Sequence, residues 1–285
     1  MTLRPRGFLE CTGDLRDARI VLLGLPFDGT CTFRPGARFG PGAVREASWV
    51  LEAYSPRLDA ELPGNRIADL GDLDLPATDP GTAWARVQRA AARLLDNGAR
   101  VLCLGGEHSL TAPLVRAHLD RHPDLTVLQF DAHADLRDRY EGEPRSHACT
   151  MRRCLDVLPP ERLFQFGVRS GTREEFAWMR AHETLRPADP ASVAEALARG
   201  EGPLYVTLDV DVFDPALVPG TGTPEPGGIG FGAFEDCLGE IARCGRPLVG
   251  ADVMELCPPY DPTGTSAVVA AKAARELLIL MAASI

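Results

Sequence analysis

Short, continuous apolar runs alternate along the chain with longer segments in which apolar residues recur every three or four positions. The short runs, such as 20–25 and 101–104, are typical of strands that are buried on both faces of a sheet. The longer segments are typical of helices. One of them begins at Asp79-Pro80, where the aspartate can cap the first turn and the proline fits it, and it ends at Gly98.

The glycines and prolines that interrupt this periodicity set the expected bounds of the elements. Strands are expected at residues 20–25, 66–70, 100–104, 125–130, 163–168, 204–208 and 247–252. Helices are expected at residues 41–51, 80–97, 109–120, 146–158, 173–182, 191–199, 234–242 and 266–283. Neither an internal repeat nor a linker interrupts the series, so we expect a single domain over residues 1–285.

Regular alternation of strand and helix indicates an α/β fold, in which a mostly parallel sheet is covered by helices. A (β/α)8 barrel would give a similar alternation and is the alternative architecture. Both folds place their functional sites at the carboxyl ends of the strands. The chemistry is therefore sought at these ends in either case.

Two of the expected strands end in acidic clusters. Strand 125–130 leads into Asp131-Ala-His133-Ala-Asp135, and strand 204–208 leads into Asp209-Val-Asp211. Residues two apart in extended chain point to the same side, so each cluster converges on one point. The two clusters side by side would repel strongly without cations. His108 follows a third strand, 100–104, and adds an imidazole at the same edge.

These residue types favour a particular class of metal. Carboxylates and imidazoles without a thiolate suit Mn²⁺, or Fe²⁺ or Ni²⁺, better than structural zinc, which prefers Cys and His. A set of this size is sufficient for two metal ions and an activated water. The alternative is a group of solvated acidic loops, which does not explain why the acids end buried strands.

The charge and the cysteine content of the chain limit the classes of partner and the cellular compartment that we expect. The formal net charge is −10 and no basic run is present, which argues against nucleic acid and anionic membranes as partners and suits a cationic substrate. The eight cysteines form no C-x-x-C motif, and neither a signal peptide nor an apolar run near 18 residues is found. We therefore expect a cytoplasmic protein with reduced cysteines.

Several longer motifs occur in a fixed order between about Gly24 and the end of the chain. They are Gly105-Gly-Glu-His108-Ser, Phe130-Asp-Ala-His-Ala-Asp135, Ser146-His147, Asp209-Val-Asp211, Pro219-Gly-Thr-Gly-Thr-Pro-Glu-Pro-Gly227 and Asp252-Val-Met-Glu255. Together they resemble the ureohydrolase family, which contains arginases and agmatinases. The resemblance implies a three-layer α/β/α sandwich, two Mn²⁺ ions per chain and hydrolysis of a guanidino group to urea and an amine.

The resemblance also implies the role of each site residue. One metal ion would be bound by His108, Asp131, Asp135 and Asp209. The other would be bound by Asp131, His133, Asp209 and Asp211, so that Asp131 and Asp209 bridge the two ions. His147 matches the proton-shuttling histidine of the family, and Glu255 matches the glutamate that pairs with the guanidinium. A carboxylate that accepts two N–H bonds suits that planar group.

Within the family, the chain resembles agmatinases more than arginases. Arginases carry an Asn/Ser-rich segment after the His-x-Asp motif, whereas this chain has Leu136-Arg-Asp-Arg-Tyr-Glu-Gly-Glu-Pro-Arg145. The expected substrate is agmatine or a similar amine, whose product enters polyamine biosynthesis. Aminopropylagmatine, guanidinobutyrate and guanidine stay open, as does arginase activity. The resemblance further implies a homotrimer or homohexamer.

Two hypotheses of other classes compete with this one. Cys149 lies two residues after His147, so a metal-free Cys/His hydrolase acting on guanidines is conceivable. Two residues that far apart on a helix do not face each other, however, and the metal-ligand residues would be left unexplained. The second alternative is a metal-binding scaffold that has lost catalysis. It would lack His147 or Glu255, and both are present.

Overall fold

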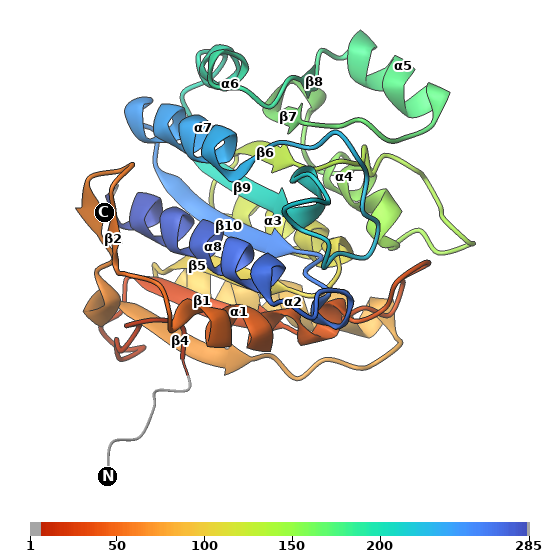
Figure 1. The fold of residues 1–285 in the computed structure, drawn as a ribbon. Coiled ribbons are helices and arrows are strands. Elements are labelled where there is room, and N and C mark those ends of the chain that lie inside the picture. Colours follow the sequence, from red (N-terminus) through yellow and green to blue (C-terminus); the bar gives the residue numbers. More distant parts are fainter. Residues whose placement is uncertain (1–6, 284–285) are drawn as a thin grey trace.

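The structure is a computed structural model that describes residues 7–283. Its centre is an eight-stranded sheet in which every strand pairing is parallel (Figure 1). In sheet order the strands are β4 (Ile67–Asp72), β1 (Ile20–Leu25), β5 (Arg100–Gly105), β10 (Leu248–Met254), β9 (Leu204–Asp209), β6 (Thr126–Phe130), β7 (Leu163–Phe166) and β8 (Leu185–Arg186).

Helices cover both faces of the sheet (Figure 1). One layer contains α1 (Gly40–Ser48), α6 (Pro190–Leu197), α7 (Phe231–Arg243) and α8 (Thr265–Ala283). The other contains α2 (Pro80–Asp96), α3 (Thr111–Leu119) and α4 (Thr150–Cys154), while α5 (Arg173–Ala181) lies beside the edge strand β8. Each layer encloses its own apolar core against the sheet. The expected three-layer α/β/α sandwich is confirmed.

The barrel alternative is wrong, because the sheet is open and has edge strands, β4 and β8. The chain instead crosses back to fill the middle of the sheet. β10, the last strand along the chain, lies between β5 and β9 and joins the two halves of the sheet. The strands β5, β10, β9 and β6 are therefore consecutive neighbours, and their carboxyl ends meet at one place.

The sequence pattern missed the shortest elements. β2 (Tyr54–Ser55), β3 (Ala60–Glu61) and β8 have two residues each, too few to show a period. The helix expected over 146–158 is wrong in length, because the segment consists of a 3₁₀ turn, His147–Cys149, followed by α4, which ends at Cys154. Pro159 and Pro160 follow this segment, and a proline disfavours helical geometry in the residue before it.

All eight cysteines are free thiols, and Cys103 and Cys237 are among those buried in the two cores. Within residues 7–283, no helix combines the length and the apolar character that crossing a bilayer requires.

A buried arginine holds α1 against the edge of the sheet. The guanidinium of Arg45 binds Asp69 through Nε at 2.8 Å and Asp72 through Nη1 at 2.5 Å, and it also donates to the carbonyl oxygen of Gly71. The side chains of Arg45 and Asp69 are 7% and 4% exposed, so the ion pair is buried.

We expect Arg45→Met to lower the free energy of unfolding by about 3–5 kcal/mol, because it leaves the buried Asp69 carboxylate without its cation. The control is Arg57→Met, which breaks an Arg57–Asp236 pair whose side chains are 43% and 47% exposed. Loss of an exposed pair costs less than about 1 kcal/mol. Urea denaturation of the two variants measures the difference, and equal costs would contradict the assigned role of Arg45.

Candidate metal centre

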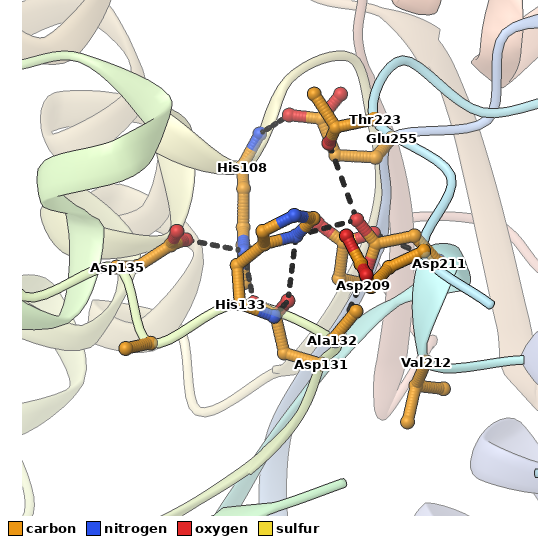
Figure 2. A network of polar contacts seen from close by, with 12 residues as sticks. His108, Asp131, Ala132, His133, Asp135, Asp209, Asp211, Val212, Thr223 and Glu255 are labelled. Carbon is orange, nitrogen blue, oxygen red and sulfur yellow. Dashed lines mark hydrogen bonds and ion pairs between the residues drawn. The ribbon is translucent and has the colours of Figure 1, made fainter. Parts of the chain in front are cut away.

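Three neighbouring strand ends bring imidazole and carboxylate groups together (Figure 2). His108 follows β5 at the start of a 3₁₀ turn, Asp131 directly follows β6, and Asp209 is the last residue of β9. The Nδ1 atom of His108 lies 3.0 Å from Oδ2 of Asp131 and 3.4 Å from Oδ2 of Asp209. It also lies 3.0 Å from Oδ2 of Asp135, which reaches in from the loop after β6.

A second group of ligand atoms adjoins the first. The Nδ1 atom of His133 lies 2.9 Å from Oδ2 of Asp211 and 3.7 Å from Oδ1 of Asp131. His133 is the most accessible of these side chains, at 26% exposed. We refer to His108, Asp131 and Asp209 as the His108 group and to Asp131, His133 and Asp211 as the His133 group. Within each group the ligand atoms lie no more than 4.8 Å apart.

The structure thus brings together all the residues that the sequence placed at a metal site. Asp131 belongs to both groups, as a bridging ligand would. Asp209 falls in the His108 group, and its Oδ1 accepts a hydrogen bond from the backbone N–H of Asp211 at 2.9 Å. That bond ties the carboxylate to the segment that carries the neighbouring ligand.

The hydrogen bonds of His108 show that the site suits a cation. Thr207 donates its hydroxyl proton to Asp252 at 2.6 Å, so its oxygen accepts from Nε2 of His108 at 2.8 Å. Nε2 therefore carries a proton, and in the neutral ring Nδ1 turns a lone pair toward the carboxylates. Although it lies close to their oxygens, Nδ1 makes no hydrogen bond within the described residues. A lone pair that faces carboxylates is repelled unless a metal ion lies between them.

Burial makes the negative charge at this site costly. Burial raises the pKa of Asp209 well above its usual value, and the neighbouring charges of Asp211 and Asp131 raise it further. Burial also raises the pKa of Asp135, and the charge of Asp131 adds to this effect. Divalent cations would stabilise the ionised forms and lower these pKa values again. The residues present therefore fit a metal centre.

His147 lies at the wall of the cavity beside the metal ligands. Its Nε2 is 3.3 Å from the hydroxyl oxygen of Thr32, and its ring meets the ring of Tyr140 edge to face. Burial lowers the pKa of His147 to about 4. His147 is thus neutral near pH 7 and able to accept a proton.

Glu255 occupies a deeper position than His147. It follows β10 directly, and its Oε1 accepts a hydrogen bond from the backbone N–H of His108 at 2.7 Å. Its φ angle of 66° is in the left-handed region, as is that of Asp135, at 52°. Non-glycine residues in this region cost about 1–3 kcal/mol each and concentrate at functional sites. The backbone N–H of Glu255 donates to Gly106 at 2.8 Å, which holds the strained conformation in place.

A cavity of about 220 Å³ opens over this site. His133, Asp135 and His147 form one part of its lining, and Arg137 and Tyr140 form another. Loop 136–145, the segment that differs from arginases, therefore reaches the cavity through Arg137 and Tyr140. Arg137 stacks on the ring of Tyr140, with its Cζ 4.8 Å from the ring centroid. The loop turns tightly after Tyr140, at Glu141 and Gly142, which both have positive φ.

Sequence reasoning missed the polar residues that hold the metal ligands and His147. Glu107 accepts hydrogen bonds from the backbone N–H and the hydroxyl of Thr30, at 2.7 and 2.6 Å, and the Thr30 oxygen accepts from the backbone N–H of His147. Thr223 donates to Asp211 at 3.3 Å. Glu107 and Thr223 lie inside motifs that the sequence analysis singled out. Thr30 and Thr32 lie in a separate loop and carry no pattern that marks them.

The surroundings of the Cys149 thiol do not activate it as a nucleophile. It is buried and lies 3.8 Å from the carbonyl oxygen of Glu143. Burial raises its pKa to about 11, and the charge of Asp135 contributes. The thiol is protonated near neutral pH, whereas a nucleophilic cysteine needs a lowered pKa. This environment argues against the Cys/His hydrolase hypothesis.

The chain is similar to known proteins in both its sequence and its fold. The sequence profile of the Arginase family matches residues 18–280. The chain is 40% identical to the agmatinase of Bacillus anthracis and 39% identical to that of Bacillus subtilis (strain 168), over 95% of each chain. It also superimposes with a TM-score of 0.90 on the crystal structure of a proposed agmatinase from Clostridium difficile. That structure is 34% identical, and the match covers 94% of this chain and 98% of the other.

We expect Thr207→Val to weaken divalent metal binding by about 10- to 100-fold, because His108 loses the acceptor that fixes its proton on Nε2. The matched control is Thr111→Val, because Thr111 donates to the same Asp252 carboxylate at 2.9 Å and lies 3.3 Å from the Thr207 hydroxyl, but makes no hydrogen bond with His108 within residues 7–283. Isothermal titration of the metal-stripped proteins measures both affinities. An unchanged affinity in Thr207→Val would show that this hydrogen bond does not orient the ligand.

Proposed function

The chain belongs to the arginase family, and from that premise we propose that it is a metal-dependent hydrolase that cleaves the guanidino group of agmatine, or of a related amine, to urea and the corresponding amine. The observation that carries the proposal is the convergence of the two ligand groups on a cavity that His147 also lines. The agmatinases at about 40% identity support agmatine as the substrate.

We propose that two Mn²⁺ ions bind per chain. His108 and Asp135 would hold one ion, His133 and Asp211 would hold the other, and Asp131 and Asp209 would bridge them. The oxygen-rich ligand set without a thiolate supports this choice of metal. When bound, the metal supplies a Lewis acid that makes water a nucleophile at neutral pH.

The protein groups would position the substrate and move the proton. Glu255 accepts N–H bonds from the guanidinium and fixes its plane. Attack of water on the guanidinium carbon forms the C–O bond of urea, and the carbon–nitrogen bond to the amine breaks. The departing amine needs a proton. His147, which is neutral before the reaction, takes a proton from the attacking water at Nε2 and delivers it to the amine.

The two alternative hypotheses, a metal-free Cys/His hydrolase and a metal-binding scaffold without catalysis, account for fewer features of the site. A metal-free thiol hydrolase would need an accessible thiolate, which Cys149 does not provide. A scaffold without catalysis would not need His147 at the cavity wall or Glu255 held by the backbone of His108. We further propose a homotrimer or homohexamer in the cytoplasm, whose oligomeric state light scattering at micromolar concentration measures.

The proton-shuttle role of His147 predicts a selective loss. His147→Ala should lower kcat by about 10²- to 10⁴-fold while the protein keeps two metal ions per chain, because within residues 7–283 none of the hydrogen bonds of His147 goes to a proposed metal ligand. The matched control is Cys149→Ala, two residues away on the same 3₁₀ turn, which should keep both activity and metal. Urea release and metal analysis of the purified variants are the measurements. Loss of metal from His147→Ala would make His147 a ligand instead.

The tail of the substrate is the second point to test. Agmatine is arginine without its α-carboxylate, and an unpaired carboxylate in a closed pocket costs about 1–3 kcal/mol. That is about 5- to 150-fold in rate. Of the arginines in loop 136–145, Arg139 donates to the carbonyl oxygen of Gly142 and Arg145 stacks on Trp84, whereas Arg137 lines the cavity.

We therefore expect kcat/KM for agmatine, or an amine-extended agmatine, to exceed that for arginine by at least about tenfold, and exhaustive chelation to abolish both activities. Urea assays over a panel of guanidino compounds provide the comparison. Equal turnover of arginine would overturn the agmatinase assignment but not membership of the family. If Arg137→Met then restored the preference, pairing of Arg137 with the carboxylate would be the cause, and Arg139→Met is the control.

A further inference from the structure

Arg169 connects three backbone segments behind the metal ligands. It follows β7, three residues after the strand ends, and its side chain is half-buried. Its Nη2 donates to the carbonyl oxygens of Asp211 and Glu225 at 2.7 Å each, and its Nη1 donates to Val212 at 3.2 Å. Its Nε donates to the carbonyl oxygens of Glu225 and Pro226 at 3.2 Å each, and Nη1 also donates to that of Gly167 at 3.3 Å.

The backbone beside Arg169 holds the loop that carries His133. The N–H groups of Arg169 and Ser170 both donate to the carbonyl oxygen of Ala132 at 2.9 Å, and the N–H of Ala134 donates to Ser170 at 3.3 Å. These bonds flank His133 on either side. One short segment therefore binds the loop of His133 through its main chain and the loop of Asp211 through the Arg169 side chain.

The two loops that this segment binds carry ligands of the same group, the His133 group. Asp211 accepts a hydrogen bond from the N–H of Ala132 at 3.0 Å and lies 2.9 Å from Nδ1 of His133. The carbonyl oxygen of Glu225 belongs to the glycine-rich loop that also places Thr223 against Asp211. His133 and Asp211 are the two ligands that the His133 group does not share with the His108 group.

We propose that Arg169 is a positioning residue for the His133 group. Its side chain binds the carbonyl oxygens of Asp211 and Val212, and its backbone holds the loop that carries His133. In this way it keeps His133 and Asp211 at the distance that binding of the second metal ion requires. An arginine suits this task because its planar fork offers several N–H donors in a fixed geometry. The proposal rests on the metal-binding part of the proposed function and is independent of the identity of the substrate.

His108, the ligand that the first group does not share, is held by different contacts. It is bound through Thr207 and through the carboxylate of Glu255, and within residues 7–283 neither has a hydrogen bond with Arg169. Loss of Arg169 should therefore affect the two metal positions unequally. A general loss of stability would weaken both positions together, so the inequality separates a positioning role from a merely structural one.

The chain offers a matched control in Arg246. This arginine is also half-buried and also joins backbone segments, because it donates to the carbonyl oxygens of Gly202 and Leu197 and to the hydroxyl of Thr126. These partners lie before β9 and at the start of β6, at the opposite end of the strands from the metal ligands. Arg246→Met therefore removes hydrogen bonds of the same kind, from a half-buried guanidinium, away from the site.

The test is titration of metal-stripped, full-length protein with Mn²⁺ by isothermal calorimetry, together with metal analysis after desalting. In Arg169→Met we expect the affinity of one site to fall about 10- to 100-fold while the other stays close to that of the wild type. His133→Ala identifies the affected site, because it should lose the same ion. Arg246→Met should keep both affinities, and saturating Mn²⁺ should restore most of the kcat of Arg169→Met.

Unchanged affinities in Arg169→Met, or an equal fall at both sites, would overturn the proposal. If that variant does not fold, Arg169→Lys replaces it, since lysine keeps the charge but cannot bind several carbonyl oxygens in one plane. The same single-site loss in Arg169→Lys would support the proposal, and wild-type affinities would overturn it. Wild-type protein that binds only one Mn²⁺ ion, or none, would instead refute the two-metal part of the proposed function.

Discussion

Repulsion between carboxylates is the constraint on which the site depends. The ends of β5, β10, β9 and β6 bring His108, Glu255, Asp209 and Asp131 into one buried region, with Asp135 and Asp211 beside them. No arrangement of apolar side chains could hold so many negative charges at this distance. The surrounding hydrogen bonds are arranged accordingly. Backbone N–H groups hold the oxygens of Asp131, Asp209 and Glu255, and the lone pair of His108 is left facing the carboxylates.

Much of the fold and of the ligand set could be predicted because each depends on local signals. A buried parallel strand appears in the sequence as an apolar run, and the acidic residues at the ends of β6 and β9 are easily recognised because they follow such runs. The order of the strands was not predictable in the same way. Nothing in the apolar run 248–254 shows that this strand lies between β5 and β9, because its pairing is set by packing of the whole chain.

The residues that support the site were missed for a related reason. Thr32 meets His147 across 115 positions of sequence, and Thr207 binds an Asp252 carboxylate 45 positions away. Arg169 binds backbone carbonyl oxygens, which every residue has, so the types of its partners carry no signal. The supporting role of such residues can be recognised only in the structure, where a guanidinium that binds several carbonyl oxygens is clearly different from one that is exposed to solvent.

The central place of β10 has a consequence for the synthesis of the protein. β5 and β9 do not pair with each other, so before β10 is added the growing chain can form two half-sheets but cannot join them. His108 belongs to one half, and Asp131 and Asp209 belong to the other. A domain generally folds as a unit during synthesis, so its sheet is completed only when all of its strands have been released. A nascent chain therefore lacks a complete His108 group, and binding of a metal ion at that position has to follow the release of the final strand.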